Sequence, residues 1–211
     1  IHALAAQGPN KGKLGPPQLL SIDEPIYAVS LLDNRAFDTT TLRIQMQSPR
    51  TPRTVIDVDM NTLSRTVRKV QPVRGGHDPQ RYTTARLWAT SHDGAKVPIS
   101  LVHRADLDRS KTHPCLIVAY AAYGYSYPAG FDRERLALLE RGFVVAIAHA
   151  RGGSELGRAW KDSGKLEHKR NTFMDVIAVA EHLISSGWTS KAQLALRGGS
   201  AGGLLVGATI N

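Results

Sequence analysis

The feature that most constrains this chain is a serine set among glycines near its C-terminal end, in the stretch Gly198-Gly199-Ser200-Ala201-Gly202. The apolar residues before it predict a strand over 194–197, and those after it predict a helix from Ala201 onward. A G-x-S-x-G sequence between a strand and a helix predicts a sharp turn that exposes the serine hydroxyl. Glycines two positions before and after the serine would let the strand and the helix approach closely. Ser200 is therefore a candidate nucleophile.

Two other interpretations of this segment stay open: a helix start without chemistry, and a glycine-rich loop that binds phosphate. The segment lacks the Lys-Ser/Thr ending of a P-loop, and a dinucleotide fingerprint that starts at Gly198 would need glycine where Ser200 stands. A helix start also directs N–H groups and a positive dipole end toward charge that develops near Ser200. The pattern therefore favours a nucleophilic serine.

Strands and helices alternate along the second part of the chain. The predicted strands cover 85–90 and 96–104, which form a hairpin around Asp93-Gly94, and then 115–120, 144–148 and 194–197. The predicted helices cover 133–141, which Gly142 ends, then 172–185, and the residues from Ala201. This alternation predicts an α/β fold with a mostly parallel sheet and flanking helices.

The helix predicted over 172–185 is amphipathic. Its apolar face would consist of Phe173, Val176, Ile177, Ala180, Leu183 and Ile184. Thr172, with Asp175 three residues later, resembles a capping box that would begin this helix.

The first 80 residues have a different pattern. Residues 1–24 are rich in Gly, Pro and Lys and predict loop, and short strands begin at about Tyr27. The clearest strands cover 41–47, 54–59 and 65–73, and residues 74–79 predict a linker. Antiparallel strands at this spacing suit a propeller blade or a small sandwich. Such a sheet is marginal alone, so we expect it to belong to something larger.

The charge of the chain raises the question of nucleic acid. The net charge is +9 and the isoelectric point about 9.9. However, the basic residues are scattered, and their densest clusters carry no interleaved aromatic residues. We therefore expect no nucleic-acid partner, and either a basic solvated surface or a fragment whose acidic half is missing.

Apolar run length, cysteine content and the chain ends indicate the expected location of the protein and the extent of the sequence. No apolar run approaches the ~18 to 20 residues that span a bilayer, so no membrane partner is expected. The single cysteine, Cys115, lies in an apolar run and excludes an internal disulfide, which favours a reducing compartment and a cytoplasmic location. The chain begins at Ile1 and ends at Asn211 just after an apolar run, so both ends are expected to be cut.

Several motifs together resemble the prolyl oligopeptidase family of serine peptidases, and within it the oligopeptidase B type. They are Arg151-Gly152-Gly153-Ser154-Glu155-Leu156-Gly157, then Trp160, Gly164-Lys165, Asn171-Thr172-Phe173 with Asp175, and the stretch from Gly198 to Leu205. Residues 34–102 also resemble the last propeller segment and the domain entry of the oligopeptidase B type. The resemblance covers about residues 30–211. It implies that residues 1–80 are the C-terminal part of a β-propeller and residues 81–211 the N-terminal half of an α/β-hydrolase domain.

The resemblance also implies roles for four residues. Ser200 matches the nucleophile, and Ala201 matches the residue whose backbone N–H serves the oxyanion hole. Tyr120 matches the tyrosine whose hydroxyl supplies the second oxyanion donor. Taken alone, Tyr120 would be interpreted as a buried aromatic residue with a satisfied hydroxyl. Tyr123 matches a position near the substrate pocket.

The chain departs from the family at two places. Relatives tend to have Tyr-Gly-Tyr-Gly around the oxyanion tyrosine, whereas this chain has Val118-Ala119-Tyr120-Ala121, so two methyl groups fill space that glycine leaves free. Two aspartates that favour a second basic substrate residue in relatives correspond here to Pro128 and Gly130, with Asp132 the nearest acid.

A complete catalytic triad is not expected within these residues. In α/β-hydrolases the chain order is Ser, acid, His, and none of the 11 residues after Ser200 is Asp, Glu or His. We interpret His149 as a strand-end residue and His168 and His182 as surface residues. No histidine pair has metal-ligand spacing, so no metal site is expected. The triad Asp and His are expected beyond Asn211.

The resemblance thus implies a serine-type oligopeptidase that cleaves short peptides through an acyl-enzyme on Ser200. It favours cleavage after basic residues, and the choice between basic residues and proline stays open. No cofactor is implied, and the oligomeric state is left open. An esterase or acylaminoacyl-peptidase relative is one alternative. A hydrolase-like binding module with a dead site is the other.

Overall fold

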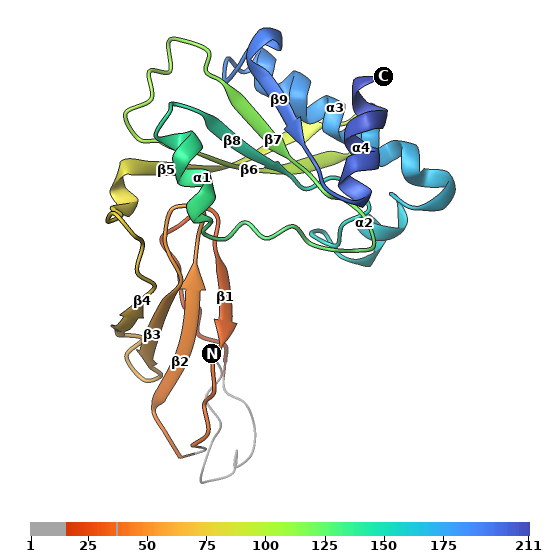
Figure 1. Ribbon diagram of the computed structural model, residues 1–211. Coiled ribbons are helices and arrows are strands. Elements are labelled where there is room, and N and C mark those ends of the chain that lie inside the picture. The colour runs from red at the N-terminus through yellow and green to blue at the C-terminus, as the bar shows by residue number, and fades with distance from the viewer. Residues whose placement is uncertain (1–15, 37) are drawn as a thin grey trace.

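A computed structural model describes residues 16–36 and 38–211 of the chain. Within this part, the chain forms a four-stranded sheet followed by a five-stranded sheet that carries the helices (Figure 1). Residues 16–24 contain neither helix nor strand, as predicted, and the rest of the loop predicted over 1–24 lies outside the described residues. None of the helices in the described part is long and apolar enough to cross a bilayer.

The first sheet is antiparallel, in the order β1-β2-β3-β4. Its strands are β1 (Ala28–Leu31), β2 (Thr41–Gln47), β3 (Thr54–Asp59) and β4 (Arg65–Val70). Alternation places Ile44 and Met46 of β2 beside Ile56 and Val58 of β3 on one buried face. The third predicted strand ends at Val70 rather than residue 73. Strand β1 lies where short strands were expected to begin, near Tyr27, although the pattern gave no bounds for it.

The second sheet is mixed, in the order β5-β6-β8-β7-β9. It consists of β5 (Tyr82–Thr90), β6 (Lys96–Arg104), β7 (Cys115–Val118), β8 (Val144–Ala148) and β9 (Leu194–Arg197). The predicted hairpin is β5–β6, and β6 also pairs antiparallel with β8. Strands β8, β7 and β9 are parallel, so their carboxyl ends meet at one edge of the sheet.

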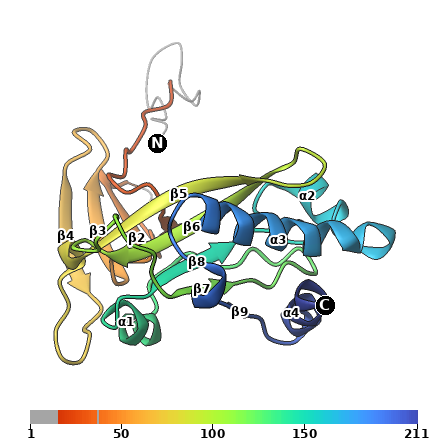
Figure 2. The same cartoon turned by 90° about the horizontal axis from the view of Figure 1, so that it is seen from above.

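Helices pack on both faces of this sheet. They are α1 (Arg133–Leu139), α2 (Arg158–Asp162), α3 (Lys169–Ser185) and α4 (Ala201–Ile210), with 3-10 turns at Pro79–Arg81, Leu166–His168 and Lys191–Gln193. Helix α3 runs alongside β5 and β6 in Figure 2. Residues of α3 and α4 share one apolar core with Ile99 and Ala146. Leu139 of α1 packs with Val102 and Val145 on the opposite face.

Two predictions about helix α3 were wrong. It begins at Lys169, not Thr172, and Thr172 is no cap because its buried hydroxyl donates to the carbonyl of Arg151 at 2.6 Å. The buried residues are Thr172, Asp175, Val176, Ala178, Val179 and Leu183. Ile177 and Ile184, placed on the core face by the sequence pattern, are only half-buried. The buried stripe is therefore shifted from the predicted face, and it includes the polar pair Thr172 and Asp175.

Candidate active site

Ser200 lies at the turn between β9 and α4, as the sequence predicts. Strand β9 ends at Arg197 and helix α4 begins at Ala201. The backbone of Ser200 has φ 53° and ψ −119°, a conformation that residues other than glycine rarely adopt. Such strain persists only where the surroundings impose it, and it holds Ser200 exposed at the tip of the turn.

The two glycines flanking the turn are required by close contacts. A Cβ on Gly198 would lie 2.2 Å from the carbonyl oxygen of Gly202. A Cβ on Gly202 would lie 2.8 Å from the carbonyl oxygen of Ala119. Strand β9, helix α4 and the end of β7 therefore meet where no side chain fits. This close approach explains why glycines stand two residues before and two residues after Ser200.

Tyr120 lies beside this turn. It follows β7, whose parallel pairing with β9 is extended by the N–H of Ala119, which donates to the carbonyl of Arg197 at 3.1 Å. A surface hollow of about 270 Å³ is lined by Val118, Ala119, Tyr120, Tyr127, Arg197, Gly198 and Gly199. The structure thus brings the predicted tyrosine and the predicted glycine-serine turn to one hollow at the carboxyl ends of parallel strands.

The alanines that replace family glycines are accommodated. Ala119 and Ala121 are both buried, and Ala121 adopts a left-handed backbone with φ 50°. The ammonium of Lys169 donates to the Ala121 carbonyl at 2.9 Å. Gly152 leaves room for the same carbonyl, because a Cβ there would lie 2.3 Å from it. The left-handed backbone at Ala121 is therefore kept by the hydrogen bond from Lys169 and by the space that Gly152 leaves.

Tyr123 is placed differently from Tyr120. Its backbone is left-handed, with φ 57°, and 83% of the residue is exposed. It does not line the hollow that contains Tyr120. Its role in substrate binding stays a prediction.

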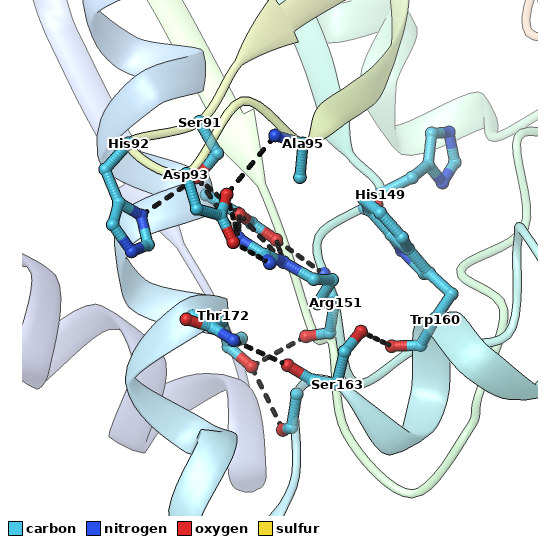
Figure 3. A network of polar contacts seen from close by, with 12 residues as sticks. Ser91, His92, Asp93, Ala95, His149, Arg151, Trp160, Ser163 and Thr172 are labelled. Atoms are coloured by element: carbon cyan, nitrogen blue, oxygen red, sulfur yellow. Dashed lines mark hydrogen bonds and ion pairs between the residues drawn. The ribbon is translucent and has the colours of Figure 1, made fainter.

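An ion-pair network that is buried at Arg151 and Asp175 and exposed at Asp93 fixes the loop that begins at Arg151 (Figure 3). The guanidinium of Arg151 donates to Asp175 at 2.6 and 2.9 Å and to Asp93 at 2.5 and 3.1 Å. Asp175 is fully buried and also accepts from the Ser91 hydroxyl at 2.7 Å. Hydrogen bonds from Arg151 lower the pKa of Asp93 to about 2. The network ties the β5–β6 turn and helix α3 to the start of the loop at Arg151.

The sequence did not predict this network. A signal was available, because Asp175 lies between apolar residues on the buried stripe of α3, and a buried carboxylate needs a cationic partner. The partner, Arg151, lies 24 residues away and could only be identified from the fold.

No base for Ser200 is found in the described part of the chain. No His, Asp or Glu described there hydrogen-bonds to its hydroxyl. His149 is buried at the end of β8, as predicted, whereas His168 is exposed and His182 is half-buried rather than on the surface. Among the described residues, no three His, Cys, Asp or Glu side chains cluster as metal ligands would.

The chain is similar to proteins of known identity. Residues 129–211 match the family described as the prolyl oligopeptidase family. The chain is 43% identical over 197 residues to Protease 2 of Moraxella lacunata, which covers 93% of this chain and 29% of the relative. It is also 43% identical over 198 residues to dipeptidyl aminopeptidase BI of Pseudoxanthomonas mexicana, covering 93% and 27%.

Solved structures agree with these relatives. Oligopeptidase B from Leishmania major superposes with a TM-score of 0.81 at 42% identity, over 95% of this chain and 28% of that one. The closed form of Trypanosoma brucei oligopeptidase B with covalently bound antipain gives 0.81 at 44% identity, over 90% and 27%. The chain thus spans less than a third of the length of these proteins. The similarities confirm the predicted fold class, a partial α/β-hydrolase domain preceded by antiparallel strands from the end of a β-propeller. The chain belongs to the prolyl oligopeptidase family.

Proposed function

We propose that this chain is the nucleophile-bearing part of a serine peptidase that acts on short peptides. The observation that carries the proposal is the strained, exposed turn at Ser200 beside the hollow that contains Tyr120. In the reaction, the Ser200 hydroxyl oxygen attacks the peptide carbonyl and forms an acyl-enzyme as the amine leaves, and water then releases the acid. The covalent antipain complex of the Trypanosoma brucei relative supports a covalent mechanism.

Two donors would stabilise the oxyanion. The backbone N–H of Ala201 lies in the first turn of α4, where helical N–H groups have no partner within the helix. The hydroxyl of Tyr120 would supply the second donor from the end of β7. Donors fixed in this way stabilise charge that develops only in the transition state.

We propose that the base and its orienting acid come from residues outside this sequence. The residues after Ser200 contain no Asp, Glu or His, and the matched relatives are more than three times as long as the chain. Residues 1–80 would be the C-terminal part of a β-propeller and residues 81–211 the first half of an α/β-hydrolase domain. The propeller would restrict access to short peptides, and the buried thiol of Cys115 fits a cytoplasmic location.

Specificity is proposed to favour one basic residue rather than two. Pro128 and Gly130 replace the acids that favour a second basic residue in relatives. Asp132, the nearest acid, is engaged as the cap of α1, where it accepts from the N–H of Glu134 at 2.9 Å. Without free carboxylates, a second basic side chain would lose charge-assisted hydrogen bonds worth ~1.5 to 3 kcal/mol.

The test is hydrolysis by the whole protein of paired arginyl substrates, an amide and an ester, each with one or two basic residues. We expect amide cleavage that Ser200→Ala abolishes, with less than about tenfold preference for dibasic substrates in kcat/KM. Cleavage of the ester alone would favour the esterase alternative. Binding of peptides without turnover would favour the inactive binding module.

A further inference from the structure

A continuous series of hydrogen bonds runs across β5, β6 and the end of β8 in the second sheet. Arg86 of β5 donates to the Ser100 hydroxyl of β6 at 2.8 Å, and that oxygen lies 2.7 Å from Nε2 of His149. Nδ1 of His149 lies 3.3 Å from Oε1 of Glu155. A carboxylate only accepts, so a neutral His149 donates from Nδ1 and accepts the Ser100 proton at Nε2.

The connectivity Ser100–His149–Glu155 is that of a catalytic triad, but burial excludes that role. Ser100 is 1% exposed and His149 is 4% exposed, so no substrate carbonyl can reach the hydroxyl. A buried, hydrogen-bonded polar chain instead fixes the positions of its members. The role of these hydrogen bonds therefore depends on the residue at the end of the series, Glu155.

Glu155 holds the segment that borders the hollow. Its Oε1 also accepts the backbone N–H of Tyr127 at 2.9 Å, and Tyr127 lines the hollow together with Tyr120 and Gly198. Tyr125 links the two tyrosines, with ring centroids 5.4 Å from Tyr120 and 6.3 Å from Tyr127. Glu155 thus reaches the proposed oxyanion tyrosine through one hydrogen bond and two ring contacts.

The carboxylate occupies space that a glycine leaves open. Oε2 of Glu155 is buried without a hydrogen-bond partner among the described residues. A Cβ on Gly153 would lie 2.1 Å from that oxygen. An unpaired buried oxygen costs stability, so the carboxylate is held in this place despite that cost. The absence of a side chain at Gly153 therefore leaves the space that the Glu155 carboxylate occupies.

We propose that Glu155 is a positioning residue, which fixes the Tyr120–Tyr127 segment beside Ser200 and is itself oriented by His149 and Ser100. This role rests on the proposed function of Ser200, and it adds a positioning residue to the same site. Glu155 touches neither the proposed nucleophile nor the hollow, so it acts through the backbone of Tyr127.

Amide hydrogen exchange of Tyr127 tests the proposal without requiring activity. In Glu155→Ala the exchange rate is expected to rise at least tenfold, because the N–H loses its acceptor. Glu155→Gln keeps an acceptor oxygen and is expected to retain most of the protection. Glu181→Ala, at an exposed glutamate of α3, is the matched control and should change nothing. Unchanged exchange in Glu155→Ala would overturn the proposal.

A double-mutant cycle with Gly153 separates positioning from general loss of stability. Gly153→Ala displaces the carboxylate, so it should lower kcat at least tenfold in the whole protein with little change in KM. In the Glu155→Ala background, the same substitution should have almost no further effect, because no carboxylate is left to displace. Additive losses would contradict the proposal. An inactive wild type would instead refute the proposed function, and the exchange result would still decide the role of Glu155.

Discussion

Tyr120 is the residue whose proposed role depends most on a single atom. Tyr120→Phe in the whole protein is expected to lower kcat by about 10- to 1,000-fold, the range for loss of one oxyanion donor. The ring and its contact with Tyr125 stay, so KM and the melting temperature should change little. Tyr27→Phe, at an exposed tyrosine far along the chain, serves as the control. An unchanged kcat would remove Tyr120 from the site.

Arg151 is the residue on which the buried network depends. Arg151→Met should destabilise the protein by about 3 to 5 kcal/mol, because it leaves the fully buried Asp175 without its partner. Urea unfolding measures the change. Arg158→Met, which breaks an exposed ion pair with Asp162, should cost less than about 1 kcal/mol. If Arg151→Met/Asp175→Leu is no more stable than Arg151→Met alone, the buried charge is not the cause.

Asp93 makes the same network sensitive to acid. Its pKa is lowered to about 2 in the folded chain, below the ~3.9 of an unfolded aspartate. The folded state therefore gains stability above pH ~4, and this gain is lost as the pH falls toward 2. Wild type should exceed Asp93→Asn in stability at pH 7, and the difference should shrink as the pH falls through 2 and vanish below it. A difference that stays constant through this range would point to packing rather than charge.

At the level of elements, the approach of α4 to β7 decides the shape of the turn. Gly202→Ala forces a methyl group against the Ala119 carbonyl, an overpacking that typically costs ~1 to 3 kcal/mol. Gly203→Ala is the matched control, since its Cβ would meet no atom within 4 Å. Alanine there should stabilise α4 by ~0.5 to 1 kcal/mol. Equal effects of the two substitutions on thermal unfolding would contradict the close approach.

Elements were predictable where local pattern determines them. Strands β3, β8 and β9 begin and end as the apolar runs indicate, and the turn at Ser200 follows from its glycines. The start of α3 was not predictable, because Thr172 is drawn inward by a hydrogen bond to Arg151 in a distant loop. The same holds for Glu155, whose hydrogen-bond partners, His149 and the N–H of Tyr127, come from two other segments. Long-range polar contacts, rather than weak propensities, limited the prediction of the site.

Across the whole molecule, one segment links the hollow to the four-stranded sheet. It leaves β7 at Tyr120, passes Tyr127, and reaches Gly130, where a Cβ would lie 2.8 Å from the side chain of Gln47 in β2. Between the sheets, His77 stacks on Tyr82 of β5 with ring centroids 5.3 Å apart, and the guanidinium of Arg50 donates to the Tyr82 carbonyl at 3.5 Å. The proposed site therefore lies at the carboxyl ends of β7 and β9, and its loop touches the other sheet (Figure 1).

We propose that Ser200 is a nucleophile whose base lies outside these residues. The direct measurement is reaction with a fluorophosphonate probe, with the adduct mapped by mass spectrometry. The whole protein should be labelled stoichiometrically at Ser200, and Ser200→Ala should not be labelled. The 211 residues alone should show almost no labelling, because a serine without an adjacent base is a weak nucleophile. Stoichiometric labelling of these residues alone, or labelling of the whole protein at another serine, would contradict the account.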